Sequence, residues 1–181
     1  MIKSKKEMKE YIAQDIKVFK YNHKPMLRLY AFLVKDFNYY RIRFLVNLRK
    51  HEYILNCHPK WVIHRFIYKH KKNKIGRYYN WEIPANVFGP GLQIWHPNIV
   101  VNDDARVGAN CVLHGSNCIG RKGDGYPNIG DNFDLGFGAV VVGDIKLGNH
   151  VTVGANSFVN KSFVENEPIV LVGSPAKILK K

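Results

Sequence analysis

The sequence predicts a mainly β protein, in which a solenoid of short parallel strands follows an α-helical N-terminal region. Two observations predict this fold. An aliphatic residue recurs at every sixth position between residues 129 and 164, and apolar residues in the first 20 positions recur at helical spacing. A six-residue period fits neither the 3.6-residue period of an α-helix nor the two-residue alternation of a flat sheet. It fits a coil in which each six-residue unit forms one strand and one corner.

The aliphatic positions determine how the coils stack. Three units close one triangular coil, so equivalent side chains lie 18 residues apart in the sequence and about 4.8 Å apart in space. Glycine follows four of them, as expected where a Cβ atom would crowd the neighbouring coil. The aliphatic residues are Ile129, Leu135, Val141, Leu147, Val153 and Val159, and the glycines are Gly130, Gly136, Gly148 and Gly154. A sandwich of evenly spaced strands is the alternative fold.

The repeat begins well before residue 129. One extra residue interrupts the period between Val100 and Val107, and four are inserted between Ile119 and Ile129, within the sequence GRKGDGYPN. Glycine, charge and proline in this insertion predict a loop that projects from the coil. The upstream inward positions are Phe88, Ile94, Val100, Val107, Leu113 and Ile119. We therefore expect about four coils over residues 82 to 164.

Three helices are expected in the N-terminal region. Residues 5 to about 20 place Met8, Ile12, Ile16 and Phe19 at helical spacing, which predicts an amphipathic helix. Pro25 and Pro59 suit the first turns of two further helices. We expect these to cover residues 26 to 50 and 59 to 76. The predicted organisation is a basic, aromatic α-helical region (1–80), a solenoid domain (81–170) and a short C-terminal segment (171–181).

The positive charge is confined to the helical region. Residues 1 to 80 hold 20 Lys and Arg against 5 Asp and Glu, a net charge of +15, whereas residues 81 to 181 hold 8 against 9. One interpretation is a peripheral contact of the basic, aromatic helices with anionic lipid headgroups. The alternative is a solvated face whose aromatic residues pack on a neighbouring coil or subunit. Nucleic-acid binding is not expected, because no recognisable nucleic-acid motif accompanies the charge.

The sequence favours a cytoplasmic protein. It contains no run of 18 apolar residues, and its first ten residues, MIKSKKEMKE, lack the hydrophobic core of a signal peptide. The three cysteines, Cys57, Cys111 and Cys118, lack metal-type spacing and cannot all pair, which fits a reducing compartment. Lipid binding by the basic helices would place the protein at the inner face of the membrane. We expect no metal.

Two histidines near one predicted corner are candidates for catalysis. His96 lies two residues after the inward Ile94, and His114 lies 18 residues further on, about one coil above it. A neutral imidazole can remove a proton from a hydroxyl group near pH 7, especially when a carboxylate orients its other nitrogen. Glu82 is the nearest preceding carboxylate. Surface histidines without a catalytic role are the alternative.

Four segments resemble the serine acetyltransferase branch of the hexapeptide-repeat acyltransferases. They are EIPANVFGPGLQIWH (82–96), IGDNFDLGFGAVVVGDI (129–145), VGANSFVNKSF (153–163) and VGSPAK (172–177). The ending G-x-P-A-K after the last coil is typical of that family. The resemblance covers residues 80 to 181, and the N-terminal part matches only loosely, as a helical cap.

This resemblance implies a left-handed parallel β-helix, a homotrimer, and acetyl transfer from acetyl-CoA in the cleft between neighbouring prisms. His96 matches the general base of the family, and Glu82 matches the carboxylate that supports it. Small residues match the positions along the pantetheine arm, and two lysines match positions near the nucleotide. These predicted CoA-binding residues are Gly138, Ala139, Ala155, Lys161 and Lys177. Packing at corners and solvation at the surface are the alternative explanations for them.

The departures from the serine branch concern the acceptor. Trp95 stands where that branch often has Asp before the base, and Gly125-Tyr126 replaces its Arg-His pair in the inserted loop. Arg121 or Lys122 could compensate, although neither is at the matching position. We therefore expect an O-acetyltransferase that acts on a sugar hydroxyl of a surface polysaccharide or its precursor, with serine as the alternative acceptor. A non-catalytic scaffold is the alternative from another functional class.

Overall fold

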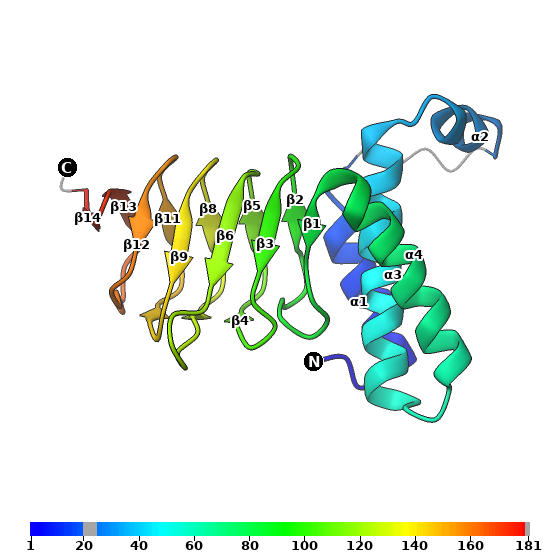
Figure 1. Ribbon diagram of the computed structural model, residues 1–181, viewed down its shortest axis with the longest axis horizontal. Helices are drawn as coiled ribbons and strands as arrows, with labels where there is room; N and C mark the ends of the chain where they lie inside the picture. Colours follow the sequence, from blue (N-terminus) through cyan, green and yellow to red (C-terminus); the bar gives the residue numbers. More distant parts are fainter. Residues whose placement is uncertain (20–24, 180–181) are drawn as a thin grey trace. The chain divides into compact units, whose positions relative to one another are not determined.

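The computed structural model describes residues 1–19 and 25–179. The chain divides into two compact units, Met1–Tyr78 and Tyr79–Lys181. The first contains helices and the second is a β-solenoid (Figure 1). The predicted combination of a parallel solenoid with preceding helices is thus confirmed, while its left-handed sense stays a prediction.

The helical unit contains four helices in its described residues. The side chain of Ser4 caps α1 by accepting a hydrogen bond from the Glu7 N–H at 3.1 Å. Helix α1 packs against α3. The helices are α1 (Lys5–Ile16), α2 (Pro25–Leu33), α3 (Phe37–Cys57) and α4 (Val62–Tyr79).

The predicted single helix over residues 26 to 50 is wrong, because the chain breaks between α2 and α3. Lys35 has φ 56°, which is left-handed backbone and cannot continue an α-helix. Asp36 then starts α3 by accepting a hydrogen bond from the Tyr39 N–H at 2.8 Å. The other boundaries differ less: α1 ends at Ile16, residue 20 lies outside the described residues, and α4 continues past Gly76.

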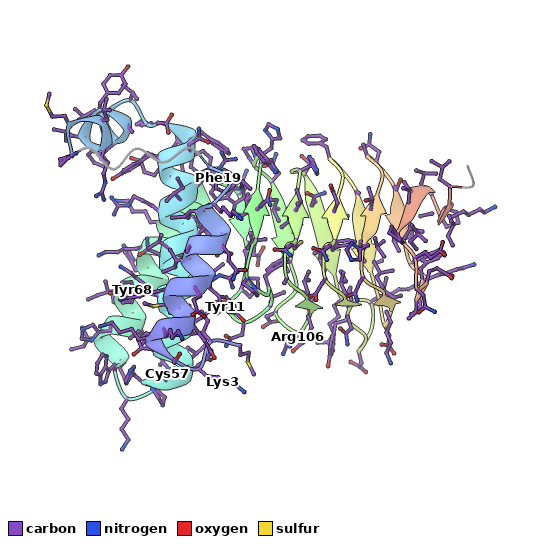
Figure 2. All side chains as sticks on the ribbon, turned by 180° about the vertical axis from the view of Figure 1, so that it is seen from behind. Lys3, Tyr11, Phe19, Cys57, Tyr68 and Arg106 are labelled. Atoms are coloured by element: carbon purple, nitrogen blue, oxygen red, sulfur yellow. The ribbon has the colours of Figure 1, made fainter. Side chains whose placement is uncertain are left out.

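A buried ionic cluster joins α1 to α3. The Arg49 guanidinium donates to both Asp15 oxygens, at 2.7 and 3.2 Å, and to Glu52 at 3.0 Å, and all three side chains are almost completely buried. Burial alone would lower the pKa of Arg49, but the Glu52 and Asp15 carboxylates outweigh it and hold the pKa above its usual value. Figure 2 labels Tyr11 on α1, whose ring centroid lies 5.0 Å from the Arg49 guanidinium carbon. Removal of either carboxylate would leave an undercompensated buried charge.

The solenoid is built from three parallel faces. One sheet has the order β1-β3-β6-β9-β12, a second has β4-β7-β10, and the third has β2-β5-β8-β11-β13, to which β14 adds antiparallel. The strands are β1 (Trp81–Glu82), β2 (Gln93–Ile94), β3 (Ile99–Val101), β4 (Arg106–Val107), β5 (Val112–Leu113), β6 (Asn117–Gly120), β7 (Asn128–Ile129), β8 (Asp134–Leu135), β9 (Val140–Val142), β10 (Lys146–Leu147), β11 (Val151–Val153), β12 (Phe158–Val159), β13 (Ile169–Gly173) and β14 (Ala176–Ile178).

The pairing of successive strands gives the number of residues in each coil. Leu135 pairs with Val153, 18 residues away, whereas Ile119 pairs with Val141, 22 residues away. The four additional residues are the predicted insertion, which projects as a loop between β6 and β7. The first sheet has five parallel strands, so the solenoid has five levels rather than the predicted four. All five strands of this sheet lie between Trp81 and Val159, because five strands span only four coil intervals.

Eleven of the twelve predicted inward positions are buried, and Val100 is the exception. Val100 is 48% exposed, while its neighbours Ile99 and Val101 are buried. The extra residue therefore lies between Ile94 and Val101, not between Val100 and Val107. It falls at the corner that contains His96, where Asn98 has φ 62°.

The corners depend on left-handed residues that sequence periodicity did not identify. Successive coils turn one corner at Asn98, Ser116, Gly138 and Asn156, whose φ values are 62°, 50°, 72° and 55°. Asparagine tolerates this conformation better than most residues because its short side chain bonds locally. The predicted reason for glycine after the aliphatic residues is confirmed at Gly130, where a Cβ atom would lie 2.8 Å from the Gly148 carbonyl oxygen.

The three cysteines are free thiols. Burial, and secondarily the Asp134 carboxylate, raise the pKa of the Cys111 thiol far above its usual value. Burial also raises the pKa of Cys118. Both side chains are therefore poor nucleophiles near neutral pH.

His51 on α3 is a buried, neutral imidazole. It is 7% exposed, and among the described residues its Nδ1 atom has no hydrogen-bond partner. Burial, followed by the nearby cations Lys72, Lys69 and Arg65, lowers its pKa to about 4. Unfolded histidine has a pKa of about 6.5.

We predict that the free energy of unfolding falls as the pH decreases from about 6.5 towards 4, because the unfolded imidazole then binds a proton that the folded one does not. His51 contributes at most about 3 kcal/mol to this loss. The substitution His51→Leu should flatten the pH dependence in urea unfolding, whereas His150→Gln at an exposed solenoid position should not. Parallel profiles for the native protein and His51→Leu would contradict the assignment.

Candidate active site

His96 lies at the solenoid corner between β2 and β3, with its side chain exposed. The buried Trp81 fixes this corner, because its Nε1–H donates to the His96 carbonyl oxygen at 3.0 Å. In the next coil, Gly115 has φ 115°, and a Cβ atom there would lie 2.5 Å from the His96 Cβ atom. The Phe137 ring, one coil further on, lies 6.4 Å from the His96 ring in a T-shaped arrangement. The absence of a side chain at position 115 lets these two rings approach.

The strand register places His114 on the coil next to that of His96, offset from it by one residue. Ile94 pairs with Leu113, a separation of 19 rather than 18, because the extra residue lies at this corner. Gly115 consequently lies beside His96, and His114 lies beside Trp95. The two histidines still belong to the same edge of the solenoid, on adjacent coils.

His114 forms a hydrogen-bonded pair with Asp134. Its Nε2 atom lies 2.9 Å from Oδ1 of Asp134, and both side chains are 41% exposed. The bond assigns the Nε2 proton to the side facing the carboxylate and leaves Nδ1 as the basic nitrogen of the neutral ring. Sequence reasoning missed Asp134, although the 22-residue register places it beside Val112, two residues before His114. Counting the four-residue insertion would have identified it.

Glu82 lies on a different face from this pair. It pairs with Val100 on β1 and β3, and its side chain lines an open cleft of about 430 Å³. Asn102, Asp103 and Arg121 also line the cleft. In the described part of the chain, the carboxylate that bonds a histidine is Asp134 rather than Glu82. Support of His96 by Glu82 therefore stays a prediction.

The inserted loop cannot carry the Arg-His pair in the form found in the serine branch. A Cβ atom at Gly125 would lie 2.7 Å from the Asp144 backbone nitrogen, so a side chain at this position would displace the neighbouring coil. Arg121 is not available to take the place of this pair, because its guanidinium donates hydrogen bonds to the Gly123 carbonyl oxygen at 2.5 Å and to the Asp124 carboxylate at 2.7 Å. Tyr126 is 43% exposed.

The predicted CoA-binding residues differ in accessibility. Gly138 has φ 72° at a corner, and Ala139 is fully buried, so the fold itself accounts for their small size. Ala155 is exposed beside Gly136, and Lys161 and Lys177 are also exposed. These three side chains are accessible to a ligand, and all five assignments stay predictions. Within the described residues, no cluster of three or more His, Cys, Asp or Glu side chains could hold a metal ion.

Comparisons with known proteins agree with this architecture. The serine acetyltransferase of Staphylococcus aureus (strain Mu50 / ATCC 700699) is 32% identical over 103 residues, which cover 54% of the chain and 47% of the relative. That of Buchnera aphidicola subsp. Schizaphis graminum is 32% identical over 134 residues, which cover 68% and 50%. The chain is a serine acetyltransferase-like hexapeptide-repeat protein. It spans about half the length of these curated relatives, and no protein-family model matches it.

Solved structures support the same fold for this serine acetyltransferase-like chain. The Neisseria gonorrhoeae serine acetyltransferase matches with a TM-score of 0.67 at 22% identity, covering 98% of this chain and 68% of that one. A serine acetyltransferase in complex with CoA matches with a TM-score of 0.70 at 21% identity, covering 97% and 70%. At these identities the likeness concerns the fold alone.

We predict that Gly115→Ala displaces His96 and destabilises the solenoid by more than the cost of left-handed alanine, which is about 1–2 kcal/mol. The matched control is Gly123→Ala, where φ is also positive, at 60°, but no atom lies within 4 Å of the added Cβ. Urea unfolding gives the stability, and the NMR resonances of the His96 ring report its position. Equal losses of stability with an unchanged His96 signal would contradict the geometry.

Proposed function

We propose that the protein is an acetyl-CoA-dependent O-acetyltransferase for a small hydroxylated acceptor, with L-serine as the first candidate. The observation that carries the proposal is an exposed imidazole, His96, on the same solenoid edge as the carboxylate-bound His114. The names of the relatives favour serine over a sugar acceptor. The confinement of the site to the solenoid fits this proposal, because the four segments that resemble serine acetyltransferases lie between residues 82 and 177.

His96 would act first as a base and then as an acid. As the acceptor oxygen attacks the thioester carbonyl carbon, His96 takes the hydroxyl proton and a new C–O bond forms. The tetrahedral oxyanion then collapses, and the C–S bond to CoA breaks. His96 returns the proton to the departing thiolate, which leaves one CoA thiol, one acetyl ester and a neutral imidazole. Trp81 supports this cycle by fixing the backbone of the corner through the His96 carbonyl.

His114 would act beside this base as a group that positions the acceptor. Its bond to Asp134 fixes the ring orientation and leaves Nδ1 able to accept a hydrogen bond from a hydroxyl or ammonium group. We propose this role for His114 because the pair is half exposed, and a purely structural pair gains little at such a position.

The donor would bind along the later coils. The exposed Ala155 gives a narrow pantetheine arm close access to the backbone, and Gly138 and Ala139 are the predicted small residues on the preceding coil. Lys161 and Lys177 are exposed and suit the phosphates of the nucleotide end. We further propose a homotrimer, with the donor in the cleft between neighbouring solenoids, and a cytoplasmic location.

A sugar hydroxyl is the second candidate acceptor. The required glycine at position 125 and the internal bonds of Arg121 remove the obvious carboxylate clamp for an amino acid. Trp95, partly exposed beside His114, offers a flat surface on which a sugar ring can stack. These observations favour an acceptor without a carboxylate, while the relatives favour serine.

We predict CoA thiol release from acetyl-CoA with L-serine, and a loss of about 10²–10⁴-fold in kcat/KM for His96→Ala, the usual effect of removing a general base. His150→Gln, at another corner, is the matched control and should retain full activity. The assay should be repeated with a panel of sugars and nucleotide sugars. Turnover of sugars but not of serine would identify a sugar as the acceptor. Full activity of His96→Ala would contradict the assignment of His96 as the general base. Failure to release CoA with every acceptor would favour a scaffold.

A further inference from the structure

The first turns of α4 expose a cluster of large apolar side chains. Trp61, Val62, Ile63, Phe66 and Ile67 are between 37% and 74% exposed, and we call these five residues the α4 patch. The spacing of the four helical members places them on one face, since residues four apart lie one above the other. Exposed apolar clusters of this kind mark docking surfaces.

The same helix is strongly cationic beyond the patch. Lys71, Lys74 and Arg77 are exposed on its later turns, whereas Lys72 and Ile75 are buried on the opposite face. No Asp or Glu occurs between Glu52 and Glu82 in the sequence. Helix α4 therefore combines an apolar end with a positively charged end and offers no carboxylate to a partner.

Helix α2 also exposes apolar side chains and carries no carboxylate. None of its residues is buried, and its side chains project all around the helix in Figure 2. Met26, Leu29, Tyr30 and Leu33 are 58% to 84% exposed. No carboxylate occurs between Asp15 and Asp36. Within the helical unit, two separate helices thus leave apolar side chains in water without any negative charge on either.

The remaining charges of the unit do not neutralise these two helices. Its five carboxylates are Glu7, Glu10 and Asp15 on α1, Asp36 at the start of α3, and Glu52 on α3. Asp15 and Glu52 form ion pairs with the buried Arg49, and Asp36 caps α3. The positive charge of α4 therefore faces the solvent uncompensated by its own helix.

We propose that the α4 patch, together with α2, docks the protein on an anionic membrane surface. Lys and Arg side chains are attracted to anionic headgroups, and aromatic residues such as Trp61 and Phe66 favour the interface between headgroups and acyl chains. A second copy of the same surface would bring like charges together, and a nucleic acid would leave Val62 and Ile63 in water. The contact is peripheral. No helix in the described ranges has both the length and the apolar composition needed to cross a bilayer.

The test is co-sedimentation of the full chain with phosphatidylcholine vesicles that contain or lack phosphatidylglycerol. We expect binding only to the anionic vesicles, with a blue shift of tryptophan fluorescence that Trp61→Phe reduces, and with weakening by salt. The double substitution Ile63→Glu and Phe66→Glu should reduce the partition coefficient at least tenfold, because it removes two apolar side chains from the inserted surface and adds two negative charges.

The matched control is Val164→Glu, which adds the same charge at a 66% exposed apolar position of the solenoid and should bind like the native chain. A second variant, Lys71→Gln with Lys74→Gln, should lose the preference for anionic vesicles. Because all these side chains are exposed, each variant should fold. Absence of native binding, or equal binding by Ile63→Glu/Phe66→Glu, would overturn the proposal. So would sedimentation velocity showing that this variant dissociates an oligomer while lipid binding is unchanged.

Discussion

The parallel backbone ladder between successive coils is the constraint on which the rest of the solenoid depends. It holds neighbouring strands about 4.8 Å apart, so every residue has a fixed partner one coil away. Where this spacing brings backbone against backbone, as between Gly130 and Gly148, no side chain fits. Where a residue is added or omitted, the ladder forces the change into a corner or a loop. The site is built at such an adjustment, since the one-residue shift between Ile94 and Val101 determines which residue lies beside His96.

The core of the solenoid could be predicted from the sequence, because a period of six admits one set of inward side chains. The position of the frame shift could not, because Ile99, Val100 and Val101 are all aliphatic and fit the period about equally well. Strand pairing decides between them: Ile99 pairs with Trp81, which leaves Val100 outside. The same one-residue shift places Gly115, rather than His114, directly beside His96. Asp134 was missed for a different reason, because its relation to His114 crosses the four-residue insertion.

In the helical unit, the spacing of apolar residues predicted helices. It predicted neither the break between α2 and α3 nor the buried ion pairs of Arg49. The break at Lys35 depends on one left-handed residue and one capping carboxylate, and neither interrupts the apolar pattern. The Arg49 cluster joins residues 34 positions apart, beyond the reach of any helical periodicity. What the sequence did indicate is the excess of positive charge. The structure adds that the carboxylates of this unit lie on α1 and α3, so that α2 and α4 expose apolar and basic side chains without any carboxylate.

The central claim is that the corner carrying His96 and His114 is the place where donor and acceptor meet. Histidine-selective NMR with increasing CoA, followed by the acceptor, tests this most directly, because His150 provides an internal reference at a different corner. We expect the ring resonances of His96 and His114 to shift saturably while those of His150 stay unchanged. A saturable shift of His150 alone, or CoA binding that leaves His96 and His114 unperturbed, would contradict the claim.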